Sequence, residues 1–521
     1  MNEAMNTTQK GFFNIIFGIV GQLVVIAFSI VTPILVIENY GSEVNGLLYS
    51  ADQVFTYLSL LEAGIGYASL QALYRPVAEN DRHEISAIMA ATRLYYNRTG
   101  MYYTLAIIAF AFLYPAVVST SLPYFLVVGV VLFGGLGGSI NYFYQGKYII
   151  LMQAEGYTYV TQKINILVNI LLSVSKIVLL LNGFGVLAVQ ISFFVIQIIR
   201  ALCYHAYIRR HYRDINFQEK PDFQAVSQKN AVLVHQISYM VFSSTDILLL
   251  TVLTQDLKIV SVYTIYNLVV NALFTMVASV SSGFDFRLGQ MFATDRKQYD
   301  RLYHVFEIFH LTLIFAVMSA LYIVFTPFIS EYTKSVTDIS YVNPWYPLLF
   351  VLVPLLTHGR TAASSGINFA GHFEQTKRYA VLEAVINLSV SICCILILGL
   401  PGALIGTIAA SLYRTTNIIM YYYKHISPDP IWKTVKRWLV CFVIFAGVVW
   451  MNAVAGIPMH GYLQIALAAV VSGLVFLAVY AGAQYAFNPE ERPLIVDLLK
   501  STIDEVLAKL HLKGRENLDD Q

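Results

Sequence analysis

The chain has 521 residues, of which 12% are charged and 57% are apolar or aromatic, and its formal net charge is +2. Soluble domains carry about 25% charged residues, so this composition excludes a water-soluble protein and predicts one that lies almost wholly within a membrane. The basic residues form no patch that would suit nucleic acid. The four cysteines all lie inside apolar stretches, without the spacing of a metal site or a disulfide framework. We expect no cofactor, no bound metal and no catalytic residue.

Apolar stretches long enough to cross a bilayer fill almost the whole chain. Because hydrocarbon offers the backbone no hydrogen-bond partner, such stretches of about 20 residues become helices. The fourteen expected spans are 11–37, 46–72, 100–119, 122–145, 160–181, 184–207, 230–253, 258–282, 304–328, 345–369, 379–399, 402–423, 436–455 and 462–486. The sequence therefore predicts an all-α, polytopic membrane protein with about 14 transmembrane helices.

The charges between the spans predict the orientation. The loops after the even-numbered spans are basic and hold, among others, Arg82, Arg93, Arg98, Arg296 and Arg437. The opposite loops offer only two lysines among several acids. By the positive-inside rule the basic loops face the cytoplasm, and both termini are then cytoplasmic.

The two halves of the chain resemble each other. Residues 8–10 before the first span correspond to 227–229 before the seventh, and the turn at 183–185 corresponds to the turn at 400–402. Six spans separate the repeats, so both have the same orientation, as in transporters built from parallel lobes. The expected parts are an N-terminal lobe at 1–220, a C-terminal lobe at 221–430, two extra helices at 431–488 and a cytoplasmic amphipathic tail at 489–521.

Three segments carry a resemblance to a known family. They are YGSEVNGLLYSADQ (40–53), EAGIGYASLQALYRP (62–76) and SSTDILLLT (243–251). The chain resembles the bacterial polysaccharide flippases, which move lipid-linked oligosaccharides and belong to the multidrug/oligosaccharidyl-lipid/polysaccharide exporter superfamily. The resemblance covers essentially the whole chain, and the family is similar in fold to the multidrug and toxin exporters and to the lipid II flippase.

The resemblance implies a function in the bacterial plasma membrane. Family members carry undecaprenyl-pyrophosphate-linked oligosaccharide from the inner to the outer leaflet by alternating access. The lipid II flippases have an arginine–acid pair in their first helix, whereas residues 11–37 of this chain hold no charge. The resemblance therefore favours a glycan of the O-antigen, teichoic-acid or exopolysaccharide type.

Charged side chains inside the spans are the candidate substrate contacts, because each costs about 2.5–3.5 kcal/mol at a helix centre. Arg360 is the strongest candidate. It lies near the middle of the tenth span and shares a helix face with Ser364 and Asn368. A guanidinium there could hold a pyrophosphate through two hydrogen bonds. The alternative is a structural ion pair with Glu383 on the next span.

Five further charges are candidates. Asp246 in the seventh span could bind sugar hydroxyls or a coupling cation or proton, or could anchor an arginine. Glu62 in the second span and Lys176 in the fifth are similar candidates, although the Lys176 ammonium could instead reach the outer surface. Arg75 and Arg287, at corresponding ends of the second and eighth spans, could receive the pyrophosphate on the cytoplasmic side or serve only to set the topology.

Other functions stay open. The chain has no Walker-type nucleotide loop, so transport would draw on a monovalent-cation or proton gradient, the membrane potential or consumption of the product. A cation-coupled drug or metabolite antiporter of the same superfamily is the main alternative, but such proteins usually have twelve helices. A membrane polysaccharide polymerase would need an external acid–base cluster, which the outward loop 331–343 lacks. Besides its lipid-linked substrate, we expect membrane lipids and glycosyltransferases or a polymerase of the same pathway as partners.

Overall fold

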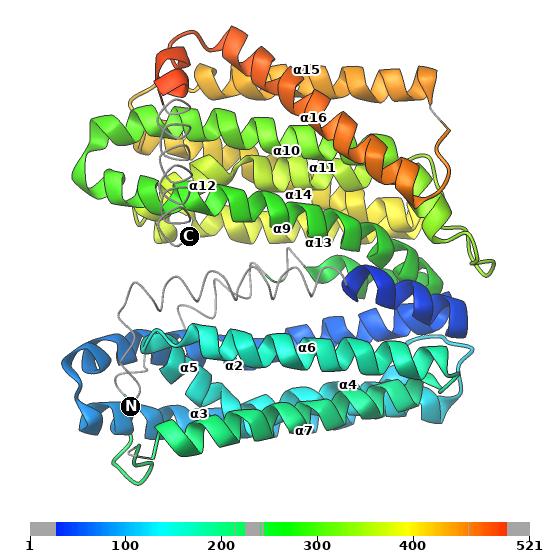
Figure 1. The fold of residues 1–521 in the computed structure, drawn as a ribbon, viewed down its shortest axis with the longest axis vertical. Helices are drawn as coiled ribbons and strands as arrows, with labels where there is room; N and C mark the ends of the chain where they lie inside the picture. Colours follow the sequence, from blue (N-terminus) through cyan, green and yellow to red (C-terminus); the bar gives the residue numbers. More distant parts are fainter. Residues whose placement is uncertain (1–27, 214, 224–239, 241–243, 457, 498–521) are drawn as a thin grey trace, which may run out of the picture. The chain divides into compact units, whose positions relative to one another are not determined.

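A computed structural model describes residues 28–213, 215–223, 240, 244–456 and 458–497. Every regular element among these residues is a helix (Figure 1). Nine of the described helices are long and apolar enough to cross a membrane. This confirms the expected all-α, polytopic membrane fold.

The helices follow the order of the expected spans. Their bounds are α2 Ser42–Glu79, α3 Arg82–Val117, α4 Tyr124–Ile140, α5 Gly146–Ala154, α6 Thr158–Leu181, α7 Val186–His211, α9 Leu257–Thr294, α10 Arg296–Tyr332, α11 Tyr346–Gly359, α12 Thr361–Phe369, α13 Phe373–Leu398, α14 Leu400–His425, α15 Trp432–Ala455 and α16 Tyr462–Phe487. Two shorter apolar helices, Phe28–Tyr40 and Ser244–Thr254, are the described parts of the first and seventh expected spans. Residues 11–27, 230–239 and 241–243 of those spans, and tail residues 498–521, lie outside the described residues.

Several helices extend beyond the apolar stretch that predicts them. The third span was expected from residue 100, but α3 begins at Arg82, so Arg82, Arg93 and Arg98 lie on a helix and not in a loop. The side chain of Asp81 caps this helix by accepting two backbone N–H groups at 3.0 Å each. Backbone hydrogen bonds and caps do not depend on hydropathy, so the helix continues into charged sequence.

Two expected spans are interrupted. The fourth span runs from α4 through the π-helical segment Asn141–Gln145 into α5. The tenth breaks at Arg360, which separates α11 from α12. The carbonyl of His358 accepts a hydrogen bond from Nε2 of His310 at 2.9 Å and another from the hydroxyl of Thr361 at 2.6 Å. These two bonds satisfy the His358 carbonyl next to the break. Arg360 lies at the junction of two short helices, whereas the sequence predicted one continuous helix.

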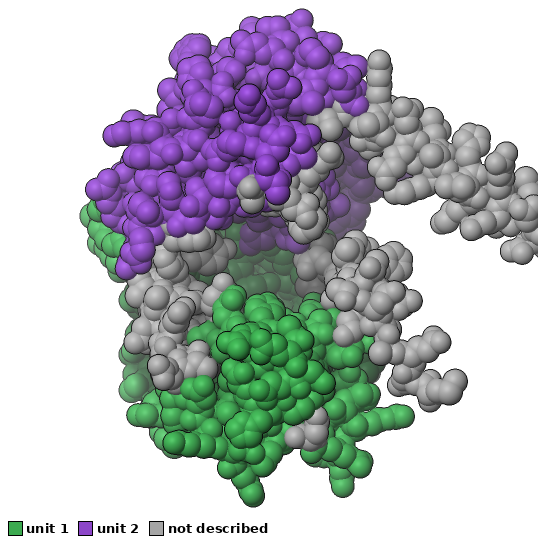
Figure 2. Space-filling model, turned by 90° about the vertical axis from the view of Figure 1, so that its left-hand side faces the viewer, with its two compact units in different colours: residues 1–269, 332–341, 380–407 green, residues 270–331, 342–379, 408–521 purple. Residues whose placement is uncertain are grey.

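The chain forms two compact units, which Figure 2 shows in green and purple. Unit 1 comprises residues 1–269, 332–341 and 380–407, and unit 2 comprises 270–331, 342–379 and 408–521. Within unit 1, α4 packs against α2, α3 and α7, and α6 packs against α7. The boundaries of the expected lobes, the extra helix pair and the tail stay a prediction.

Candidate functional site

A polar cavity of about 490 Å³ lies inside unit 1. Helix Phe28–Tyr40, α2, α4, α6 and α7 form its wall. Its main polar lining residues are Asn45, Asp52, Asn169, Ser173, Lys176 and Gln190. The volume falls within the range of about 300–1,000 Å³ that is usual for small-ligand sites. Because polar groups are costly among membrane helices, a cavity lined this way fits a polar ligand.

Asp52 and Lys176 are the charged residues of this lining, and they attract each other electrostatically. Lys176 was a predicted site residue, and it lines the cavity. Asp52 was not among the predicted site residues. The signal was present in the spacing, because Asn45, Tyr49 and Asp52 follow one another at four and three residues and so share one face of α2.

Asp246 belongs to a separate buried cluster in unit 1. One carboxylate oxygen, Oδ2, accepts hydrogen bonds from the hydroxyls of Thr407 at 2.9 Å and Tyr263 at 3.1 Å. Asn387 donates its amide N–H to the Thr407 hydroxyl at 3.0 Å. Among the described residues, Oδ1 of Asp246 and Oδ1 of Asn387 are buried and accept no hydrogen bond. A site for a hard cation or a proton needs acceptor oxygens of this kind. The oxygen of Asp246 also carries charge.

A row of side-chain hydrogen bonds, which we call the outer seam, joins α2 to the second half of the chain within unit 1. Its pairs are Ser42–Asp338 at 2.7 Å, Asn45–Ser261 at 2.8 Å, Ser50–Thr251 at 3.0 Å and Tyr57–Thr245 at 2.6 Å. The backbone also approaches closely, because a side chain at Gly46 would overlap the carbonyl of Leu257. The charge pattern predicts that this end of α2 faces outward.

Glu62 and Arg75, both on α2, have local partners. Tyr96 and Tyr142 donate hydrogen bonds to the Glu62 carboxylate, and Tyr142 lies on the π-helical segment between α4 and α5. The exposed Arg75 guanidinium pairs with Glu79 one turn further along the same helix, at 3.0 Å. Within unit 1 the structure therefore brings Lys176 to Asp52, but it gives Asp246, Glu62 and Arg75 three different surroundings.

The remaining predicted site residues belong to unit 2. Arg360 is half-buried at the junction of α11 and α12, Ser364 is half-buried on α12, and Asn368 is exposed near its end. The backbone N–H of Ser364 donates to the Arg360 carbonyl at 3.0 Å, which begins the hydrogen bonding of α12 at the junction. The Arg287 side chain lies outside what the structure describes.

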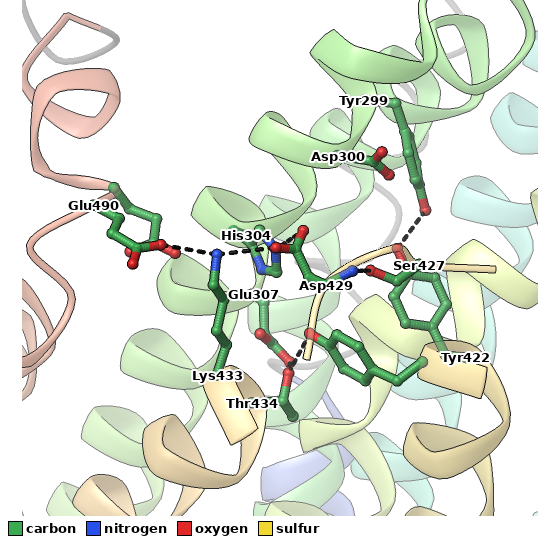
Figure 3. Close-up of polar contacts among 12 residues, drawn as sticks. Tyr299, Asp300, His304, Glu307, Tyr422, Ser427, Asp429, Lys433, Thr434 and Glu490 are labelled. Carbon is green, nitrogen blue, oxygen red and sulfur yellow. Dashed lines mark hydrogen bonds and ion pairs between the residues drawn. The ribbon is translucent and has the colours of Figure 1, made fainter. Parts of the chain in front are cut away.

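A second polar network lies in unit 2 and is centred on Arg437 (Figure 3 shows most of its other members). The guanidinium is fully buried and pairs with Glu307 of α10 and with Glu491, which follows α16, at 2.5 Å each. It also donates to Nδ1 of His304 at 2.8 Å. An arginine can only donate, so His304 carries its proton on Nε2, which donates to Asp429 at 2.9 Å. From the sequence, Arg437 was counted with the basic residues at the start of the span 436–455. In the structure it is a buried residue of α15 that joins α10, α15 and the segment after α16.

Two carboxyls at the edge of this network lie outside the membrane-spanning segments. Burial by itself would raise the pKa of Asp429, but hydrogen bonds from His304 and Lys433 hold that pKa below its ordinary value. The hydrogen bond from Lys433 at 2.9 Å likewise lowers the pKa of Glu490. Both carboxylates are therefore engaged as anions in the network.

No protein-family model and no curated protein matches the sequence. The fold, however, is similar to that of solved membrane transporters. A structure of the lipid II flippase MurJ in an inward closed conformation gives a TM-score of 0.66 at 14% identity, covering 89% of this chain and 98% of that chain. An inward-facing structure of a multidrug resistance MATE family transporter of the MOP superfamily gives 0.59 at 15% identity, covering 78% of this chain and 96% of that chain.

An outward-facing structure of a MATE family transporter of the MOP superfamily gives a TM-score of 0.55 at 16% identity and covers 80% of this chain and 95% of that chain. The chain therefore has the fold of these polytopic transporters.

The Arg437 network generates a stability prediction. Arg437→Met removes the cation and leaves the carboxylates of Glu307 and Glu491 buried without compensation, so we expect a loss of about 3–5 kcal/mol in the free energy of unfolding. The melting temperature of the purified protein in detergent measures this loss. Lys436→Met removes the same charge one residue earlier on α15 and should cost less than about 1 kcal/mol. Equal melting temperatures for the two variants would contradict the central role of Arg437.

Proposed function

We propose that the protein flips an oligosaccharide linked to undecaprenyl pyrophosphate from the inner to the outer leaflet of a bacterial plasma membrane. The observation that carries this proposal is the polar cavity inside unit 1. A lipid-linked sugar needs shielding from acyl chains, and the amides, hydroxyls and charges of the wall can replace its water. Its long polyprenyl tail can stay in the lipid. No covalent chemistry is required, so we propose a transporter and not an enzyme.

Alternating access is the transport mechanism that we propose. The outer seam closes the end of α2 that is expected to face outward, while most of its bonds join neutral hydroxyls and amides. Each such bond contributes only about 0.5–1.5 kcal/mol net, so the seam can break one bond at a time. Transporters of similar fold have been solved in inward-facing and outward-facing conformations.

The cluster around Asp246 is our proposed coupling site. Its two acceptor oxygens without donors, on Asp246 and Asn387, and the Thr407 hydroxyl that both side chains contact would bind a monovalent cation or a proton. Binding neutralises the buried carboxylate, and this gives an ion gradient a way to favour one conformation over the other.

The other predicted residues take roles around the substrate. Lys176 would contact the glycan or its phosphate in the cavity, and Glu62 would contact sugar hydroxyls. Arg360, with Ser364 and Asn368 on the same side of α12, would hold the pyrophosphate, and Arg75 and Arg287 would receive it on the cytoplasmic side. Both termini would be cytoplasmic.

A cation-coupled drug or metabolite antiporter is the second candidate, because MATE transporters share the fold. The flippase is favoured by the share of this chain that each likeness covers, which is 89% for MurJ and 78% for the inward-facing MATE transporter. If the protein exported drugs and its deletion left the lipid-linked sugars unchanged, the antiporter would become the first candidate.

Locking the outer seam should stop transport. In a background without native cysteines, Ser50→Cys and Thr251→Cys place thiols where two hydroxyls now lie 3.0 Å apart. A mild oxidant that joins the two thiols in a disulfide should abolish export of the glycan, and reduction of the disulfide should restore it. Thr104→Cys with Ser139→Cys, a pair at 2.9 Å between α3 and α4, is the matched control and should export normally when cross-linked. Undiminished export through a locked seam would refute alternating access at this place.

Replacing Arg360 should leave the lipid-linked oligosaccharide in the inner leaflet. Arg360→Ala removes the proposed pyrophosphate contact, so undecaprenyl-linked oligosaccharide should accumulate in the inner leaflet at least about tenfold, as expected for the loss of one charge-assisted contact. Arg360→Lys keeps the charge and should restore part of the export. Both lipid-linked sugar and finished polymer are quantified at matched protein levels. Normal export by both variants would leave Arg360 a structural role at best.

Neutralising Asp246 should uncouple transport from its ion. Asp246→Asn removes the charge that would bind the cation, so the initial export rate in vesicles should stop responding to an imposed sodium or proton gradient. The gradient that drives the wild type identifies the ion. Asp81→Asn keeps the cap of α3 and serves as control. A rate that is insensitive to both gradients in wild type and variant alike would exclude ion coupling at Asp246.

A further inference from the structure

A second hollow, of about 740 Å³, lies in unit 2 at one end of α13 and α14. The first turns of α13 provide Arg378, and the last turn of α14 provides Lys424 and His425. The loop from α14 to α15 closes the remaining side. All of these segments belong to the end of the helices that the charge pattern predicts to be cytoplasmic.

The electrostatics of this hollow favour an anion. Among the described residues, neither Arg378 nor Lys424 forms an ion pair. The Arg378 guanidinium lies over the Tyr379 ring at 4.9 Å and donates to its hydroxyl at 2.9 Å, which holds its position. The acid of the wall, Asp429, is already paired with His304 and Lys433 (Figure 3). The hollow therefore carries uncompensated positive charge.

An apolar groove of about 220 Å³ continues from this hollow between α14 and α15. Leu412 and Ile419 of α14 face Val435 and Phe442 of α15 across it. Met420 and Ile431 line both the hollow and the groove, so the two are contiguous. Trp432 is next to this junction in the sequence and is 63% exposed, and tryptophan is typical of the boundary between membrane and water.

We infer that unit 2 holds a site for an anionic glycerophospholipid of the inner leaflet. Its phosphate binds Arg378 and Lys424, and one acyl chain lies in the groove between α14 and α15. Basic pockets between membrane helices on the cytoplasmic side are suited to such head groups. A free phosphate would not use the groove, and in a zwitterionic lipid the choline ammonium would offset the phosphate charge that attracts the two cations. The inference does not depend on what the protein transports.

The test measures lipid binding to the delipidated full-length protein. Phosphatidylglycerol and phosphatidylcholine with the same acyl chains are titrated separately, and bound lipid is counted by native mass spectrometry. Phosphatidylglycerol should bind more tightly to the wild type. Arg378→Gln with Lys424→Gln should weaken it about fivefold for each charge removed. Thr416→Trp, at an exposed position of the groove wall, should weaken both lipids without changing the charge.

The control variant is Arg209→Gln with Arg210→Gln, which removes two exposed charges from the last turn of α7 and should leave binding within twofold. Equal binding of phosphatidylglycerol by all variants would overturn the site. Glycerol phosphate that competes as well as the whole lipid would show a phosphate site without a lipid. Undecaprenyl phosphate that binds more tightly than phosphatidylglycerol would assign the hollow to the transported lipid and overturn the phospholipid proposal.

Discussion

The structure depends on one constraint, which is that polar groups within a bilayer must find their partners in the protein. The backbone meets it by forming helices, and many hydroxyls meet it on their own helix, as Thr254 does with the carbonyl of Leu250 at 2.7 Å. Among the described residues, polar side chains that instead bond to other helices gather in the cavity with Asp52 and Lys176, in the Asp246 cluster and in the Arg437 network, besides the outer seam and the pair of tyrosines at Glu62. We expect ligands to bind where polar side chains within the bilayer remain accessible to them.

The helix α2 links two of the features on which the proposed transport depends. Asn45 lines the polar cavity and also donates to Ser261 in the outer seam at 2.8 Å. Two turns further along, Asp52 lines the same cavity. Because Asn45 cannot leave Ser261 without freeing a polar group in the cavity wall, breaking the seam changes the lining that a substrate meets. Opening of the outer end and release of the substrate would then be one event.

The sequence predicts the order and kind of the described helices well, because hydropathy directly measures the preference for hydrocarbon. It underestimates the length of α3, whose charged first turns from Arg82 are held by capping and backbone bonds. It misses the break at Arg360, because the bond from His310 to the His358 carbonyl joins residues 48 apart in the sequence and comes from tertiary structure. It places Arg437 at the start of the span 436–455 and counts it among the basic loop residues, but it misses the buried network, because a buried guanidinium is recognisable only once its carboxylates are known to lie beside it.

The same reasoning separates the parts that can move from those that cannot. The bonds of the outer seam are mostly neutral and net about 0.5–1.5 kcal/mol each, so water entering from outside can replace them at little cost. The Arg437 network contains two buried carboxylates around one guanidinium, and separating such a pair costs about 3–5 kcal/mol. A conformational cycle driven by modest ligand energies can break the first repeatedly but not the second. The helices that Arg437 joins, α10 and α15, should therefore move as one body while α2 parts from its partners across the seam.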